Sequence, residues 1–142
     1  MATLQSATII IPKSSEEEFL EKVEKARPSI MADFEFFHNS VVVAKFIRDK
    51  IGNLYTAHQT QTEDKWQGKT GYVIALGPSA FKDEPGFDFH GLSVEPGDWA
   101  IYRHTDGWDF DYTIPGTSDK LHLRLLEDTQ IKGRTKRPEL IW

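Results

Sequence analysis

Gly68-Lys69-Thr70 has the residue types that close a phosphate-binding loop. In that loop a first glycine stands five residues before the second, and the chain then enters a helix whose N-terminus faces the phosphate. Glu63 occupies the place of the first glycine here, and the stretch that follows, Tyr72-Val-Ile-Ala-Leu76, is typical of a strand. We therefore predict no nucleotide or other cofactor site at this triplet.

Histidines and acids could hold a metal ion or act as an acid pair. The five histidines include no pair at i and i+4, so a metal site would have to be assembled from distant loops. Asp88 and His90 could offer two ligands, but a loop of this composition is usually hydrated. Asp109 and Asp111 would face the same side of a strand, yet no second carboxylate pair or aromatic sugar cleft accompanies them. We predict no metal site and treat both aspartates as solvated charges.

No nucleophile with a base beside it is evident in the sequence. The chain has no cysteine, which excludes a disulfide framework, a thiolate metal site and a cysteine nucleophile. No Gly-x-Ser-x-Gly elbow occurs either. We therefore expect no catalytic residues and a protein that is not an enzyme.

Length and composition favour one domain with a core of its own. The chain has 142 residues, of which 39% are hydrophobic. Its 17 basic and 22 acidic residues give a net charge of −5, which argues against a nucleic-acid partner. No secretory leader and no apolar run of membrane-spanning length is present, so we expect no membrane and a soluble protein of a reducing compartment.

One amphipathic helix is predicted near the N-terminus, at about 15–26. Ser15 followed by Glu18 is a capping-box signature, and Pro28 is expected to stop the helix. Between them apolar residues recur at helical spacing: Phe19, Leu20, Val23 and Ala26.

Beyond residue 34 the apolar pattern changes to short strands. Four are predicted, at 40–44, 72–76, 99–102 and 121–125. The last alternates cleanly, with one apolar face formed by Leu121, Leu123 and Leu125. Before the third strand, Pro96-Gly97 predicts a tight turn that Asp98 can cap. With no βαβ rhythm, the pattern favours a mainly β fold, a small irregular antiparallel barrel.

Two loops are longer than a connection requires. The first spans about 49–69 and is polar, with apolar residues near its start: Ile51, Leu54 and Tyr55. The second spans about 78–92 and carries aromatic residues among acids and glycines: Phe81, Phe87 and Phe89. Such residues either contact a partner or fold back on the core.

The C-terminal stretch is basic and then apolar. It follows Ile131, carries four cations within 132–137, and closes with Leu140, Ile141 and Trp142. A tail of this kind either dangles or docks on a neighbour.

The order of the β segments resembles the chaperonin-10 family, the GroES co-chaperonins. The resemblance covers about 36–131 and is carried by His38-Asn-Ser-Val-Val-Val-Ala-Lys45, Lys69-Thr-Gly-Tyr-Val-Ile-Ala-Leu-Gly77, Val94-Glu-Pro-Gly-Asp-Trp-Ala-Ile-Tyr102, Asp106-Gly107 and the closing strand from Leu121 to Ile131. It implies a GroES-like β-barrel whose edge strands pair between identical subunits and so close a ring. The interface residues would then include Leu121, Leu123, Leu125 and Ile131.

The resemblance also implies a non-enzymatic function in protein folding. Family members bind a chaperonin ring through a loop after the first strand, and Ile51, Leu54 and Tyr55 occupy that loop here. The family usually has three aliphatic residues after paired glycines, whereas this chain has Gly52-Asn53-Leu54-Tyr55. Phe81, Phe87 and Phe89 match a roof-type loop, and Trp108 matches an inward-facing aromatic position.

The two ends of the chain lie outside the family pattern. We divide the chain into an arm with the helix (1–35), the barrel (36–131) and the tail (132–142). Divergent relatives of this fold are encoded by tailed phages. The alternatives are therefore a co-chaperonin of the cytoplasm, perhaps a host cytoplasm in which it folds a capsid protein, and a virion structural protein that contacts other virion proteins.

Overall fold

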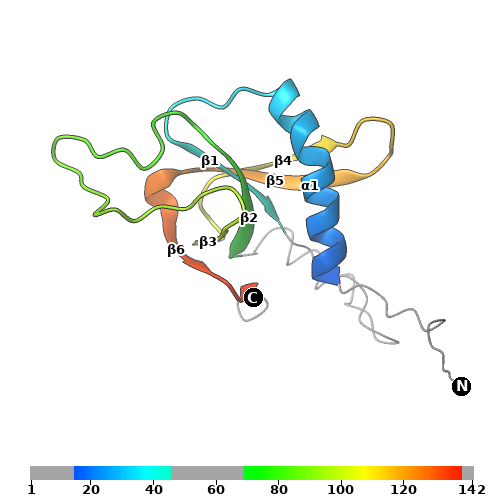
Figure 1. Cartoon of the computed structure of the whole chain (residues 1–142). Helices are drawn as coiled ribbons and strands as arrows, with labels where there is room; N and C mark the ends of the chain where they lie inside the picture. Colours follow the sequence, from blue (N-terminus) through cyan, green and yellow to red (C-terminus); the bar gives the residue numbers. More distant parts are fainter. Residues whose placement is uncertain (1–14, 46–68, 139–142) are drawn as a thin grey trace, which may run out of the picture.

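The computed structural model describes residues 15–45 and 69–138. The fold is mainly β, with one N-terminal helix and a single antiparallel sheet, as predicted (Figure 1). In chain order the elements are α1 (Ser15–Asp33), β1 (Ser40–Lys45), β2 (Thr70–Leu76), β3 (Trp99–Tyr102), β4 (Trp108–Thr113), β5 (Lys120–Glu127), the short 3₁₀ helix η2 (Asp128–Gln130) and β6 (Ile131–Thr135). In these ranges no helix is long and apolar enough to cross a membrane.

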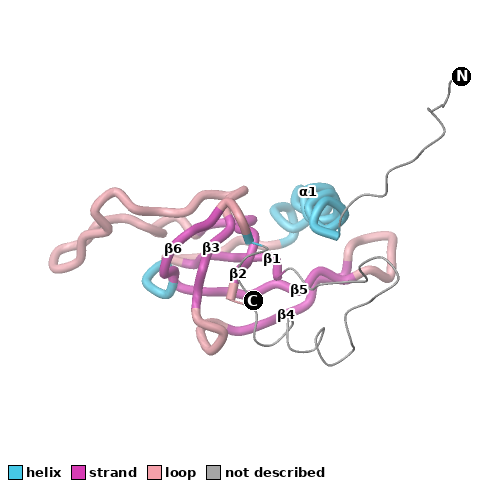
Figure 2. The backbone as a smooth tube through the Cα atoms, turned by 90° about the horizontal axis from the view of Figure 1, so that it is seen from below, coloured by secondary structure: helices cyan, strands magenta, loops and turns pink. Residues whose placement is uncertain are grey.

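The sheet has six strands in the order β4-β5-β1-β2-β3-β6, and it is not closed. All five neighbouring pairs are antiparallel. Within the described ranges, β4 and β6 each pair on one side only and form the two edges. The chain therefore forms an open, strongly curled sheet with two edge strands (Figure 2).

The four predicted strands are present as β1, β2, β3 and β5, but β4 and β6 were not predicted. In β4 the aromatic residues Trp108, Phe110 and Tyr112 alternate with polar ones, so a period-2 signal was available. β6 has the sequence IKGRT, which carries no such signal and pairs with β3 through its backbone. The predicted boundary between barrel and tail at 131/132 is therefore wrong, because it cuts through β6.

The helix does not stop at Arg27-Pro28 but runs to Asp33. A proline inside a helix loses one backbone hydrogen bond and costs about 3 kcal/mol. The last turns offset this cost because Ile30 is fully buried, which contributes about 1.5–3 kcal/mol. Tyr112 adds a hydrogen bond from its hydroxyl to Asp33 Oδ2 at 2.9 Å. Tertiary contacts thus outweigh the local stop signal.

Each face of the sheet has its own apolar cluster. On one face, α1 buries Val23, Ala26 and Ile30 against residues of the four strands β1, β2, β4 and β5. Figures 1 and 2 show α1 lying across this face. The opposite face forms the inside of the curl, and its cluster contains Val41, Val43, Val73, Val94, Ala100, Tyr102 and Leu126.

The turn before β3 forms as predicted. Gly97 has a φ of 103°, which glycine adopts without steric cost. Asp98 caps the turn, since its carboxylate accepts a 2.9 Å hydrogen bond from the backbone N–H of Glu95. The turn is also held against β2, because the N–H of Gly97 donates to the carbonyl of Val73.

Candidate functional site

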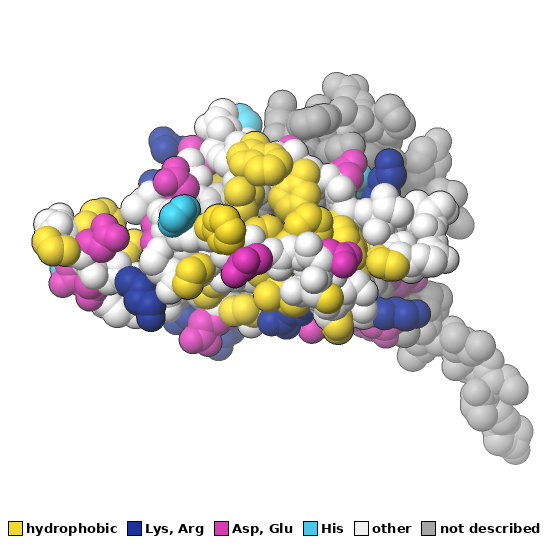
Figure 3. Space-filling view, turned by 90° about the horizontal axis from the view of Figure 1, so that it is seen from above, with side chains coloured by type: hydrophobic (Ala, Val, Ile, Leu, Met, Phe, Trp, Pro, Cys, Tyr) yellow, Lys and Arg dark blue, Asp and Glu magenta, His cyan; other side chains and the backbone are white. Residues whose placement is uncertain are grey.

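The loop between β2 and β3, the roof-type loop (residues 77–98), gathers its three predicted aromatic residues. The ring centroids of Phe81 and Phe89 are 5.5 Å apart, and those of Phe87 and Phe89 are 4.8 Å apart. Glu84 and Phe87 exchange two backbone hydrogen bonds of 2.9 Å, which close a tight turn. The loop projects from the body of the molecule and carries apolar side chains at its surface (Figures 1 and 3).

Asp128 fixes the base of this loop. Its carboxylate accepts hydrogen bonds from the backbone N–H of Phe81 at 3.0 Å and from the side-chain amide of Asn39 at 2.9 Å. Phe81 has a φ of 58°, a left-handed conformation that is unfavourable for a bulky side chain. The hydrogen bond to buried Asp128 stabilises it. Sequence reasoning did not single out Asp128, because only the fold brings it beside Phe81.

A pocket of about 390 Å³ lies between the roof-type loop and the η2–β6 segment. This volume falls in the range of small ligand sites, about 300–1,000 Å³. Its apolar walls are formed by Phe81, Phe87, Phe89, Leu92, Val94 and Ile131. The structure thus brings the predicted roof residues together with Ile131, which the sequence assigned to a subunit interface.

The rim of the pocket carries charges of both signs. Asp88 lies on the loop side, and Lys132 and Arg134 lie on β6. Arg134 Nη1 donates a 3.2 Å hydrogen bond to the carbonyl of Ser93, and it lies 3.6 Å from Asp98 Oδ2. One cation of β6 thus already holds the roof-type loop in place.

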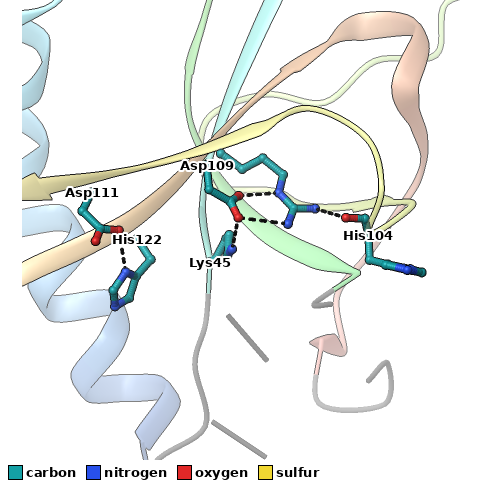
Figure 4. Close-up of polar contacts among 6 residues, drawn as sticks. Lys45, His104, Asp109, Asp111 and His122 are labelled. Carbon is teal, nitrogen blue, oxygen red and sulfur yellow. Dashed lines mark hydrogen bonds and ion pairs between the residues drawn. The ribbon is translucent and has the colours of Figure 1, made fainter. Parts of the chain in front are cut away.

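A second cluster lies on the inner face of the sheet, where β1, β4 and β5 run side by side (Figure 4). Asp109 Oδ2 is 2.9 Å from Lys45 Nζ, and Asp109 Oδ1 is 2.7 Å from Arg124 Nε. Arg124 also donates to the carbonyl of His104 at 3.1 Å. The side chains of Lys45 and Arg124 are only 2% and 3% exposed. We call Lys45, Asp109 and Arg124 the ion cluster.

The ion cluster keeps Asp109 ionised. Burial of this carboxyl would raise its pKa, but the hydrogen bonds and positive charges of Arg124 and Lys45 outweigh that effect and lower the pKa below its ordinary value of 3.8. Both carboxylate oxygens are engaged, so this group is held for structure rather than for proton transfer. The prediction that Asp109 is a solvated charge is therefore wrong.

Tyr102 lies beneath the ion cluster. The guanidinium carbon of Arg124 lies 5.2 Å from the centroid of its ring. The Tyr102 hydroxyl is buried and has no hydrogen-bond partner, a condition it shares among the described side chains with Thr70 Oγ1. Burial raises the pKa of this phenol well above its ordinary value, so it stays neutral.

Asp111 pairs with His122 on the same two strands. Nδ1 of the imidazole is 2.7 Å from Asp111 Oδ1, and both side chains are partly exposed (Figure 4). The carboxylate orients the ring, as it would in an acid–base pair, but the described residues supply no nucleophile bonded to His122. Nor do the parts of the chain described contain three potential metal ligands in one group.

β1 and β2 are paired neighbours, and their connection is much longer than such a pair needs. Lys45 at the end of β1 lies opposite Gly71 of β2, and the chain between them covers residues 46–68. Ile51, Leu54 and Tyr55, predicted to bind a partner, belong to this connection and lie outside the described residues. The ion cluster fixes the point at which the connection leaves the sheet, because Lys45 is its first member.

The leucines predicted for a subunit interface are occupied within the chain. β5 is an inner strand between β4 and β1, so its backbone is paired on both sides. Leu121 and Leu123 are buried beneath α1, and Leu125 packs partly buried beside them. Leu140, Ile141 and Trp142 lie outside the described residues.

Exposed aromatic residues surround the end of α1 and the start of β4. Trp108, predicted to face inward in a ring, is 59% exposed in the single chain and contacts Phe110. Phe37 is 60% exposed, and Phe34 packs on Phe36 and Tyr112. Apolar side chains gather on this side of the molecule (Figure 3). The sequence run Phe34-Glu-Phe-Phe37 gave a signal for this patch that went unused.

Comparison of the sequence with protein-family models finds no match, and comparison with curated proteins finds none either.

Proposed function

We propose that the chain is a subunit of a ring-forming, GroES-like co-chaperonin that assists protein folding in the cytoplasm. The observation that carries the proposal is the connection between β1 and β2. Two adjacent antiparallel strands can be joined by two residues, yet residues 46–68 separate Lys45 from the strand that pairs with it. Connections of this length inside a compact domain usually serve binding.

The stem of the connection supports this role, because a binding segment must be presented from a fixed base. On one side Lys45 is held by Asp109 at 2.9 Å. On the other, Gly71 packs closely on Val43 and Tyr102 in the core. The segment that carries Leu54 and Tyr55 thus starts and ends at rigid points.

The open sheet supports the ring. β4 and β6 present edges in the described structure that a second copy could pair with. Association through edges would bury backbone groups that otherwise depend on water. The ring and the binding segment together make up the proposed co-chaperonin.

The test measures mass and chaperonin capture separately. Native mass spectrometry should find a closed oligomer, and a chaperonin should capture it in a nucleotide-dependent way. Replacing Leu54 and Tyr55 with serine should abolish capture and leave the oligomer intact, whereas the control Thr60→Ala/Gln61→Ala in the same connection should change neither. Unchanged capture by the serine variant would remove the proposed mechanism.

A virion structural protein is the second candidate, and the aromatic patch around Phe34, Phe37 and Trp108 favours it. A binding segment at 46–68 makes no use of this exposed apolar surface, whereas assembly into a larger particle would bury it. A well-formed oligomer that no chaperonin captures, and whose incorporation into particles is lost on Phe37→Ser, would favour this function.

A further inference from the structure

The pocket between the roof-type loop and β6 exposes apolar side chains that an isolated chain would bury if it could. Leu92 is 72% exposed and Phe87 is 49% exposed, and both line the pocket. The loop is nonetheless firmly built, since Asp128 holds Phe81 and the backbone of Phe89 donates to Asp83. A preformed apolar pocket on a fixed loop is suited to receive an apolar segment.

The loop that forms one wall is acidic. Between residues 82 and 95, one lysine is accompanied by four acids, namely Asp83, Glu84, Asp88 and Glu95. Asp88 stands on the rim with 61% of its side chain exposed. An occupant with cations next to its apolar residues would therefore be attracted to this wall.

The chain itself contains a segment of that chemistry. Residues 136–142 read Lys-Arg-Pro-Glu-Leu-Ile-Trp, two cations followed after two residues by three apolar side chains. We propose that the pocket of one subunit receives the segment Leu140–Trp142 of a neighbouring copy, with Lys136 and Arg137 facing the acids of the roof-type loop. The C-terminal segment then links identical subunits.

The donor is a neighbour because a chain's own segment would have to reverse. β6 lines the pocket from Ile131 onward and leads away from the roof-type loop (Figure 1). The four residues after Pro138 reach at most about 14 Å when fully extended. To fill its own pocket, the segment would have to turn back over that distance along the strand it has just left.

This inference rests on the proposed assembly of identical subunits but does not depend on capture by a chaperonin. The test uses the full chain with Leu140, Ile141 and Trp142 replaced by serine, so that its own segment cannot compete. A fluorescently labelled peptide of residues 136–142 should bind this protein saturably in an anisotropy titration. The same peptide with its three apolar residues replaced by serine should not bind.

The pocket is tested with residues whose replacement spares the core. Phe87→Ser together with Leu92→Ser should raise the Kd of the peptide at least about tenfold. The matched control is Phe37→Ser, which removes an equally exposed phenylalanine outside the pocket and should leave the Kd unchanged. Absence of saturable binding, or an equal effect of Phe37→Ser, would overturn the inference. Peptide binding without chaperonin capture would keep it and remove only the proposed function.

Discussion

Lys45 Nζ lies 2.9 Å from Asp109 Oδ2, although 64 residues separate the two in the chain. Asp109 stands on the edge strand β4 and Lys45 on β1, with Arg124 of β5 between them. One carboxylate therefore ties together three strands and the starting point of the connection at 46–68. The consequences of this contact can be measured.

Replacing Asp109 with asparagine should destabilise the fold by about 2–3 kcal/mol. Breaking a fully buried ion pair costs about 3–5 kcal/mol, because a charge is left without its partner, and the 18% exposure of Asp109 lets water reduce this cost. Urea denaturation measures the free energy of unfolding. The control Asp88→Asn, on a side chain 61% exposed, should change it by less than about 0.5 kcal/mol. Equal effects of the two substitutions would show that the ion cluster contributes nothing special.

The same carboxylate should make stability depend on pH on the acid side. Its pKa is lower in the folded chain than its ordinary value of 3.8, so its contribution is fully present above that value and is lost as the pH falls through the folded pKa. The difference in unfolding free energy between the wild-type chain and Asp109→Asn should therefore be constant from neutral pH to about pH 5 and shrink below about pH 4. A difference that stays constant down to pH 3 would contradict the assignment.

Most of the sheet could be predicted from sequence because its inner strands are continuous apolar runs. The Val41–Ala44 run and the alternation at Leu121 to Leu125 specify buried positions directly. β6 could not be predicted, since its residues are polar and its partner β3 is known only from the fold. The helix end at Asp33 was missed for a similar reason, because Ile30 is stabilised by contacts that local rules do not include.

The sites were less predictable than the fold. The aromatic residues of the roof-type loop stood out by type, and the structure brings them together. The ion cluster was hidden, because Lys45, Asp109 and Arg124 are ordinary surface residue types until strand register places them side by side. Arg124 alternates with apolar neighbours and would be expected to face water, yet the curl of the sheet turns that face inward.

Two tyrosines with different surroundings offer a direct comparison. The hydroxyl of Tyr102 is buried without a hydrogen-bond partner, whereas that of Tyr112 donates to Asp33 at 2.9 Å. Tyr102→Phe should therefore leave stability unchanged within about 0.5 kcal/mol or raise it, because no hydrogen bond is lost and an unsatisfied group is removed. Tyr112→Phe should lower the midpoint of thermal unfolding. A larger loss for Tyr102→Phe would show that its hydroxyl has a partner.

The packing of the stem can be tested with two glycines, both in strands and neither with a positive φ. A Cβ on Gly71 would lie 2.5 Å from Val43 Cγ2 and 3.0 Å from Tyr102 Oη, so Gly71→Ala forces the core apart and should cost about 1–3 kcal/mol. On Gly133 the nearest atom would be Ile101 Cδ1 at 3.6 Å, an ordinary contact.

Gly133→Ala should accordingly be neutral or slightly stabilising. The two substitutions reduce the freedom of the unfolded chain equally, so the difference between their unfolding free energies isolates the close approach of β2 to β1. If the stem also presents residues 46–68, Gly71→Ala should weaken chaperonin capture at temperatures where the protein remains folded, while Gly133→Ala leaves capture unchanged. Equal stability of the two variants would mean that Val43 and Tyr102 can move aside and that the stem is not rigid.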